Sequence, residues 1–173
     1  EALLMEYLLG KTTDKKQRAY LINHFLDQFK GTLYRQTMFA EFERELGRMA
    51  ERGETLTADA LDEKYLALNR LYFGPDMISD AQIALEWARI PHFFYNYYVF
   101  QYATGFSSAV AIAEHILTTG DASGYLKFLT TGGSDYPLEE LKIAGIDLTK
   151  PDTVRSALRV FDETIDELAK ILL

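Results

Sequence analysis

Apolar residues recur at three- and four-residue steps along most of the chain, and this spacing predicts amphipathic α-helices. The stripe of the longest predicted helix consists of Tyr20, Leu21, Phe25, Leu26 and Phe29. Thr13 or Asp14 is expected to cap its first turn. The same period continues to about Ala50, with a local relaxation expected at Gly31 because glycine weakens a helix. No stretch shows the two-residue alternation of a strand.

Glycine, proline and capping residues divide the rest of the chain into shorter helices. The predicted segments are residues 1–9, 57–73, 80–89, 92 to about 104, 121–129, 136–144 and 151–172. The helix from residue 92 is expected either to continue or to restart through Gly105 and to reach Thr119. Gly10 is expected to end the first of them, and Pro91 to stand in the first turn of another. The pattern as a whole predicts an all-α helical bundle, a single domain over residues 1–173. Because the first residues open in mid-helix without a preceding Met or cap, we expect a fragment of a larger protein.

Composition excludes several classes of function. The 173 residues carry 18 Lys and Arg against 26 Asp and Glu, a formal net charge of −8. Binding to a nucleic-acid backbone requires a basic face, so no nucleic-acid partner is expected. There are no cysteines, which excludes disulfides and thiolate chemistry and fits a reducing compartment. No apolar run approaches the length of a membrane span, so no membrane partner is expected.

The three histidines give no metal site. His24, His92 and His115 are far apart in sequence, and none forms a His-x-x-x-His pair. A complete zinc site is therefore not expected in this chain.

One aromatic segment, residues 90–105, stands out as candidate chemistry. If it is wound as a helix at about 100° per residue, four polar aromatic residues share a face roughly 120° wide. They are His92, Tyr95, Tyr98 and Tyr102, while Phe93, Phe100 and Thr104 point away towards a core. Such a face is able to bind a peptide carbonyl and the oxyanion formed from it. The alternative is an aromatic helix buried on all sides.

A second segment, residues 35–43, combines charged and aromatic residues. Arg35 with Glu41 or Glu43 is expected to form an ordinary ion-pair network there rather than a site.

Five segments, in this order, resemble the C-terminal third of the oligoendopeptidase F family, in the thimet oligopeptidase group of zinc metallopeptidases. They are residues 1–9 (EALLMEYLL), 35–43 (RQTMFAEFE), 85–92 (LEWARIPH), 98–105 (YVFQYATG) and 133–137 (GSDYP). The resemblance covers essentially the whole chain. It implies one lobe of a helical, clam-like, channel-containing zincin that admits short peptides.

The resemblance also implies how the site is built. Zinc is the expected cofactor, and its His-Glu-x-x-His segment would lie upstream of this chain. Glu1 would lie two helical turns after the third zinc ligand, beside the metal site without binding the metal. His92 and Tyr102 are the expected catalytic residues, stabilising the oxyanion, and Tyr95 and Tyr98 the expected substrate-binding residues. The parent would be a cytoplasmic enzyme, and this fragment alone would be inactive.

A different class of function stays open beside this one. The chain is also compatible with a non-catalytic helical module that binds a partner helix or a small apolar ligand. An upstream sequence without His-Glu-x-x-His would favour that alternative.

Overall fold

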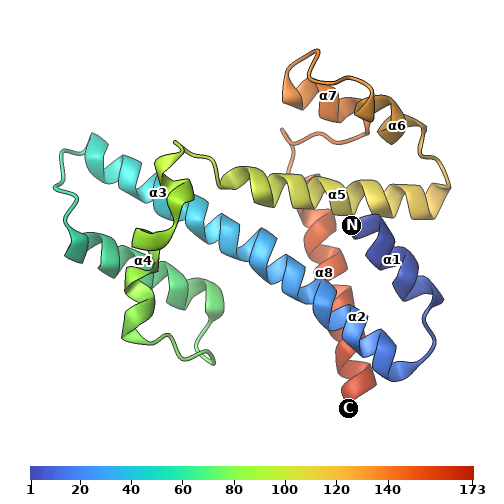
Figure 1. The fold of residues 1–173 in the computed structure, drawn as a ribbon, viewed down its shortest axis with the longest axis horizontal. Coiled ribbons are helices and arrows are strands. Elements are labelled where there is room, and N and C mark those ends of the chain that lie inside the picture. The colour runs from blue at the N-terminus through green and yellow to red at the C-terminus, as the bar shows by residue number, and fades with distance from the viewer. The chain divides into compact units, whose positions relative to one another are not determined.

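The computed structural model describes every residue from Glu1 to Leu173, and all of its regular elements are helices (Figure 1). This confirms the predicted all-α class, while the clam-like lobe and its channel stay predictions. The chain forms two compact units, Glu1–Lys30 with Thr104–Leu173, and Gly31–Ala103. Compact units are not always independently folding domains, so the single domain over residues 1–173 also stays a prediction.

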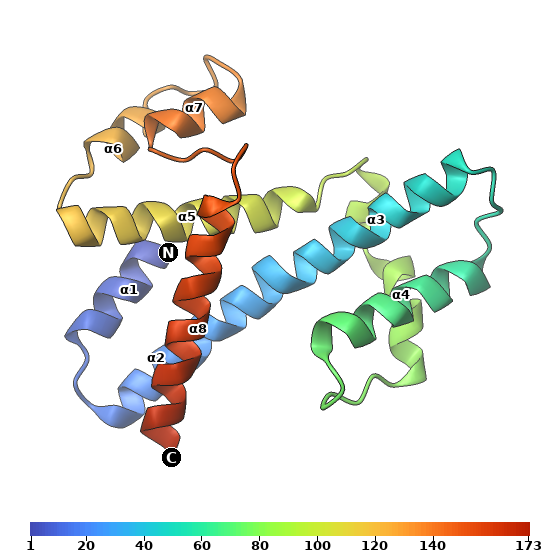
Figure 2. The same ribbon diagram turned by 180° about the vertical axis from the view of Figure 1, so that it is seen from behind.

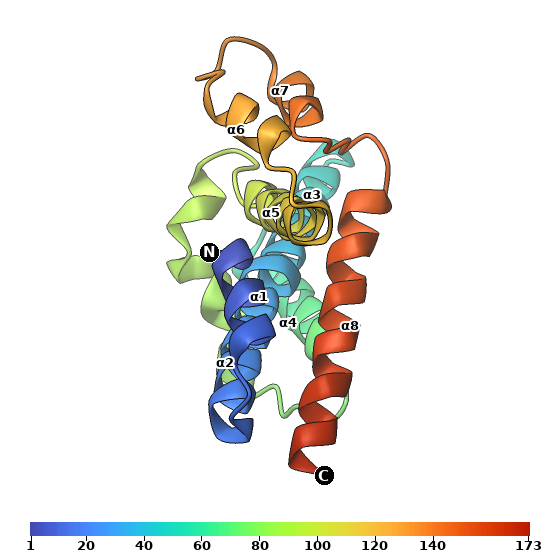
Figure 3. The ribbon, with the colours of Figure 1, turned by 90° about the vertical axis from the view of Figure 1, so that its right-hand side faces the viewer.

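The first unit is built around a cluster of phenylalanine rings. Its helices are α1 (Ala2–Lys11), α2 (Lys15–Gln28), α5 (Phe100–Thr119, from Thr104 on), α6 (Ser123–Leu129), α7 (Pro137–Ile143) and α8 (Asp152–Leu172). α2 packs against α1 and α8 (Figure 2), and α6 packs against α7 (Figure 3). The fully buried ring of Phe29 lies 5.1 Å from Phe25, 4.9 Å from Phe106 and 5.2 Å from Phe161. Aromatic pairs at this spacing stabilise a core beyond the apolar area that they bury.

The second unit carries a core of its own. After the π-helix η1 (Phe29–Tyr34), its elements are α3 (Arg35–Glu51), α4 (Ala58–Phe73) and the 3₁₀-helices η2 (Ala81–Arg89) and η3 (Pro91–Phe94). α4 packs against α3 and η2 (Figure 1). The buried core is Met38, Phe39, Phe42, Leu61, Tyr65, Leu68, Ile90 and Val99. Residues from four separate stretches of sequence therefore meet in one cluster.

Several predicted helix boundaries are confirmed. The Asp14 carboxylate accepts a hydrogen bond from Gln17 N at 2.9 Å, and the Thr57 hydroxyl accepts one from Ala60 N at 3.3 Å. Both are side-chain caps that satisfy backbone donors in a first helical turn.

The predictions made for two glycines, Gly10 and Gly31, have different outcomes. Gly10 does not end the first helix, because α1 continues to Lys11 and is capped at Thr12. At Gly31 the expected relaxation takes the form of the π-helix η1, which joins α2 to α3. π-helices are rare and occur mostly as single turns inside longer α-helices.

No helix of the structure has both the length and the apolar character needed to cross a bilayer.

Two carboxylates approach each other inside the first unit. Glu6 is part-buried, and its Oε1 is buried without a hydrogen-bond partner. Burial raises the pKa of Glu6 from 4.5 to about 7, with a further contribution from the negative charge of Glu114. Glu114 itself is held by Arg159 and by the Ser156 hydroxyl, which donates to it at 2.6 Å. Glu6 is therefore the member of the pair that holds its proton up to the higher pH.

This arrangement predicts a pH-dependent stability. The folded-state pKa of Glu6 lies above the unfolded value. The contribution of protonated Glu6 to the free energy of unfolding is therefore complete below about pH 4.5 and is lost as the pH rises through about 7. Glu6→Gln should raise the free energy of unfolding at pH 8 by about 1 kcal/mol, a figure reduced for solvent screening of a part-exposed group. At pH 4 it should change little. Chemical denaturation at both pH values measures this, with the exposed Glu51→Gln as control; equal effects at both pH values would contradict it.

Candidate functional site

The segment that carries the candidate residues is not one helix. η3 ends at Phe94 and α5 begins at Phe100, so the predicted helix is interrupted over residues 95–99. The interruption coincides with Asn96 and Tyr97, which have φ values of 52° and 59°. Two successive left-handed residues cannot continue a right-handed helix. The helical prediction for this stretch is wrong.

The four polar aromatic side chains nevertheless meet. The His92 ring centroid lies 5.8 Å from Tyr95, 5.7 Å from Tyr98 and 5.9 Å from Tyr102. Tyr98 is 6.0 Å from Tyr95 and 5.6 Å from Tyr102. His92 and Tyr98 are stacked, with 19° between their planes, and the other pairs meet edge to face. We call these four residues the His-Tyr cluster.

Hydrogen bonds connect the polar ends of the His-Tyr cluster. The Tyr102 hydroxyl lies 3.3 Å from Nε2 of His92, and the imidazole tautomer sets which of the two donates. The pKa of Tyr102 is raised, first by a hydrogen bond with the Tyr98 hydroxyl and then by desolvation. A raised pKa keeps the Tyr102 phenol protonated at neutral pH, and a protonated phenol is a hydrogen-bond donor.

The cluster lies open rather than inside the core. Tyr95, Tyr98 and Tyr102 are 58%, 38% and 37% exposed. The alternative of an aromatic helix buried on all sides is therefore wrong for this structure.

Phe93 and Phe100 were both expected to point away from the polar aromatic face and towards a core. Phe93 packs on the core as expected, at 5.2 Å from Phe39 and 5.3 Å from Phe42. Phe100 was expected to do the same, but it is half exposed. The interruption before α5 turns Phe100 out of the direction that a continuous helix would have given it.

The charged groups of α3 pair differently from the prediction. Arg35 pairs with Glu86 of η2, not with Glu41 or Glu43. Glu86 also pairs with Arg89 and accepts a hydrogen bond at 2.6 Å from the buried Tyr65 hydroxyl. The partner of Arg35 is far away in sequence, which is why helical spacing along α3 did not reveal it.

Glu43 is instead turned inward. Its side chain is buried, and its Oε1 accepts a hydrogen bond from the backbone N–H of Tyr97 at 3.1 Å. Sequence reasoning missed this contact between α3 and the interrupted segment. The available signal was the four-residue spacing of Phe39, Glu43 and Gly47, which puts a carboxylate and a glycine on the same side of α3 as a core phenylalanine.

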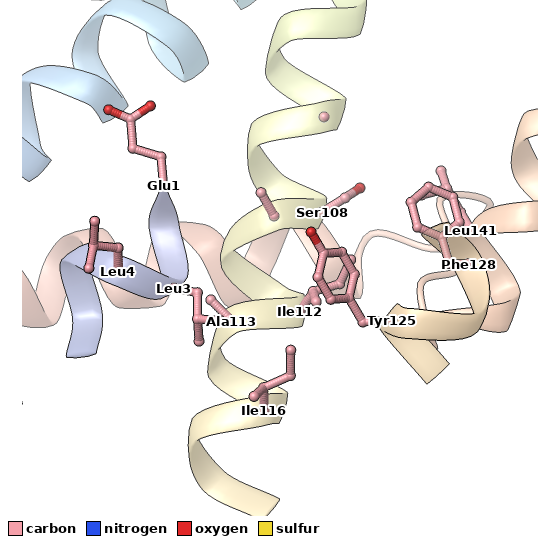
Figure 4. Close-up of a pocket in the computed structure, with 12 residues that line it drawn as sticks. Glu1, Leu3, Leu4, Ser108, Ile112, Ala113, Ile116, Tyr125, Phe128 and Leu141 are labelled. Carbon is pink, nitrogen blue, oxygen red and sulfur yellow. The ribbon is translucent and has the colours of Figure 1, made fainter. Parts of the chain in front are cut away.

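Glu1 belongs to the first unit and stands at the start of α1. It accepts a hydrogen bond from the Gln28 amide at 2.8 Å. It also lines one end of an apolar pocket of about 410 Å³, where α1 faces α5 and the α6–α7 pair (Figure 4). The other walls of the pocket include Leu3, Ile112 and Phe128.

Nowhere in the chain do three or more His, Cys, Asp or Glu side chains come close enough together to hold a metal ion.

The helical fold and the segments described above are those of a known class of proteins. The family model for peptidase family M3 matches residues 1–160, and the chain belongs to this family. The resemblance to oligoendopeptidase F is confirmed by individual relatives. Oligopeptidase PepF of Bacillus subtilis is 50% identical over 100% of this chain and 26% of its own length. Group B oligopeptidase PepB of Streptococcus agalactiae is 46% identical over 99% of this chain and 29% of its own.

Solved structures give the same result. The crystal structure of oligoendopeptidase-F from Enterococcus faecium superposes with a TM-score of 0.94 at 47% identity, covering 98% of this chain and 33% of that one. A putative peptidase from Chlamydophila abortus gives a TM-score of 0.88 at 38% identity, covering 97% and 29%. The chain therefore spans about a third or less of the length of the relatives it matches.

The packing of Phe93 predicts a contrast with its neighbour. Phe93→Ala should lower the free energy of unfolding by about 2–3 kcal/mol, because it removes a ring that fills the core beside Phe39 and Phe42. Phe94→Ala is the matched control, since Phe94 is 78% exposed, and should change it by less than about 0.5 kcal/mol. Chemical denaturation measures both; equal losses would show that Phe93 does not anchor the segment.

Proposed function

We propose that this chain is the substrate-binding part of a zinc-dependent oligoendopeptidase that hydrolyses short peptides. The observation that carries the proposal is the His-Tyr cluster, an exposed group of imidazole and phenol donors on a chain of peptidase family M3. The names of the relatives, oligopeptidase and oligoendopeptidase F, support short peptides as the substrate class. The absence of cysteines is consistent with a cytoplasmic location.

The chemistry follows from what these side chains can donate. Attack on a peptide carbonyl places negative charge on its oxygen, and preorganised donors aimed at that position lower the barrier. His92 and Tyr102 would supply these donors, since their polar atoms already lie 3.3 Å apart. Tyr95 and Tyr98 would hold the peptide beside them through ring faces and hydroxyls.

Zinc would be held outside this chain. Three suitable ligands do not come together here, so the metal-binding residues would belong to the rest of the parent chain. Glu1 would lie beside that site without binding the metal, oriented by its hydrogen bond with Gln28.

Replacing a single donor tests the proposal. In a full-length enzyme carrying these residues, Tyr102→Phe should lower kcat by on the order of 10²–10³-fold, because it removes one oxyanion donor. The stability should change by less than about 0.5 kcal/mol, since Tyr102 is 37% exposed. Steady-state hydrolysis of a quenched fluorescent peptide measures the rate. Tyr20→Phe is the control, because Tyr20 is 73% exposed and lies in α2. An unchanged kcat for Tyr102→Phe would remove this residue from the mechanism.

The position of the metal site gives a separate prediction. The isolated 173 residues, supplied with zinc and the same peptide, should show no zinc-dependent turnover, because they lack the required ligands. Clear turnover that a chelator abolishes would overturn the placement of zinc outside this chain.

A further inference from the structure

The interrupted segment holds a backbone conformation that needs support. Asn96 and Tyr97 are both left-handed, with φ of 52° and 59°, and neither is glycine. Each such residue costs on the order of 1 kcal/mol, and it persists only where surrounding contacts hold it. Tyr95 and Tyr98 flank this pair directly, so whatever holds the pair also sets the direction of both phenols.

Three residues of α3, spaced four apart, contact either Phe93, just before the segment, or Tyr97 within it. Phe39 packs against Phe93 at 5.2 Å between ring centroids. Glu43, one turn later, accepts the Tyr97 backbone N–H at 3.1 Å. Gly47, one turn later again, lies under the Tyr97 side chain, where a Cβ would stand 2.3 Å from the phenol oxygen. One face of α3 therefore contacts the segment through a ring, a carboxylate and a bare backbone.

The Glu43 carboxylate is unusual because it is buried. It is only 8% exposed, and its Oε2 is buried without a hydrogen-bond partner. Burial raises its pKa, while the backbone N–H groups of Tyr97 and Val99 act in the opposite direction. Burying a carboxylate costs desolvation free energy, and the fold is destabilised unless hydrogen bonds to the carboxylate offset that cost. Here the donors come from the backbone of the interrupted segment, next to the fully buried Val99.

We infer that Glu43 and Gly47 are positioning residues, which hold the Tyr95–Val99 backbone so that the phenols of the His-Tyr cluster face a bound peptide. This inference rests on the proposed function and deepens it, because it attributes the positions of the His-Tyr cluster's side chains to contacts from α3. Neither residue touches the peptide. Each acts through the backbone or the ring of Tyr97.

Substitution at Glu43 tests the hydrogen bond. In the full-length enzyme, Glu43→Leu should lower kcat about 10- to 100-fold, since small displacements of catalytic groups are expensive. It should also speed hydrogen exchange in a peptide covering residues 95–99 at least tenfold. Glu43→Gln keeps one acceptor oxygen and should retain most of the activity and protection. The control is Glu51→Leu on the exposed end of α3, which should match the wild type in both measurements.

Substitution at Gly47 tests the ring contact without touching Glu43. Gly47→Ala should lower kcat modestly, because the new Cβ would stand 2.3 Å from the Tyr97 oxygen and displace the end of this half-exposed side chain. Adding Tyr97→Phe removes that oxygen and leaves the ring carbon at 3.6 Å, an ordinary contact. The double variant should therefore recover at least half of the lost rate, and Tyr97→Phe alone should behave as the wild type. Gly10→Ala is the matched control, since no atom lies within 4 Å of its Cβ.

The outcomes separate this inference from the proposed function. If Tyr102→Phe lowers kcat but Glu43→Leu and Gly47→Ala do not, the positioning role is overturned and the function stands. If Tyr102→Phe has no effect while residues 95–99 lose protection in Glu43→Leu, the function fails and the anchoring contact stands without a catalytic role. Failure of the Tyr97→Phe rescue would show that Gly47→Ala acts through general destabilisation, which also overturns the inference for Gly47.

Discussion

The hydrogen bond between the buried Glu43 carboxylate and the Tyr97 backbone is the interaction on which the candidate site depends. It holds a short segment in which Asn96 and Tyr97 take left-handed conformations, and this is the point where η3 stops and α5 has not begun. Without such support the chain would gain by continuing as a helix or by loosening. With it, the segment turns back on α3 and brings the His92 and Tyr102 side chains into contact.

The surroundings of this hydrogen bond are correspondingly rigid. Phe42 lies 5.2 Å from Tyr65 and 5.3 Å from Phe93, so the core behind the segment consists of interlocking rings. The Tyr65 hydroxyl donates to Glu86, and the carboxylate and burial together raise the pKa of that phenol, with burial the larger cause. A site on a packed support keeps its geometry better than one on a free loop. The exposed tyrosines therefore stand on a closely packed aromatic base.

The sequence predicted the helices well and the interruption not at all. Asp14 and Thr57 are of residue types that commonly cap helices, and both do so here. The weakness expected at Gly31 corresponds to a π-helix. These signals are local, and local patterns can be read from one chain. Asn96 and Tyr97 carry no comparable signal, because the residues that contact Tyr97, Glu43 and Gly47, come about fifty residues earlier in the sequence. Helical winding grouped the four cluster residues correctly, although the backbone that brings them together is not a helix.

A similar limit applies to the charged residues. The spacing along α3 offered Glu41 and Glu43 as partners for Arg35, yet the pairing is with Glu86 on another element. Ion-pair partners distant in sequence depend on how elements pack, which periodicity does not describe. For the aromatic segment, spacing left two alternatives open, and family resemblance favoured the one in which it faces a peptide.

A crystal structure of the full-length enzyme with a phosphinic peptide, whose tetrahedral phosphorus carries an oxyanion in place of the scissile carbonyl, tests the role of the His-Tyr cluster most directly. A phosphinyl oxygen is expected about 2.6–3.2 Å from the Tyr102 hydroxyl or the His92 imidazole, with Tyr95 or Tyr98 in contact with the flanking peptide. An inhibitor bound at the metal while all four side chains contact only solvent would contradict it.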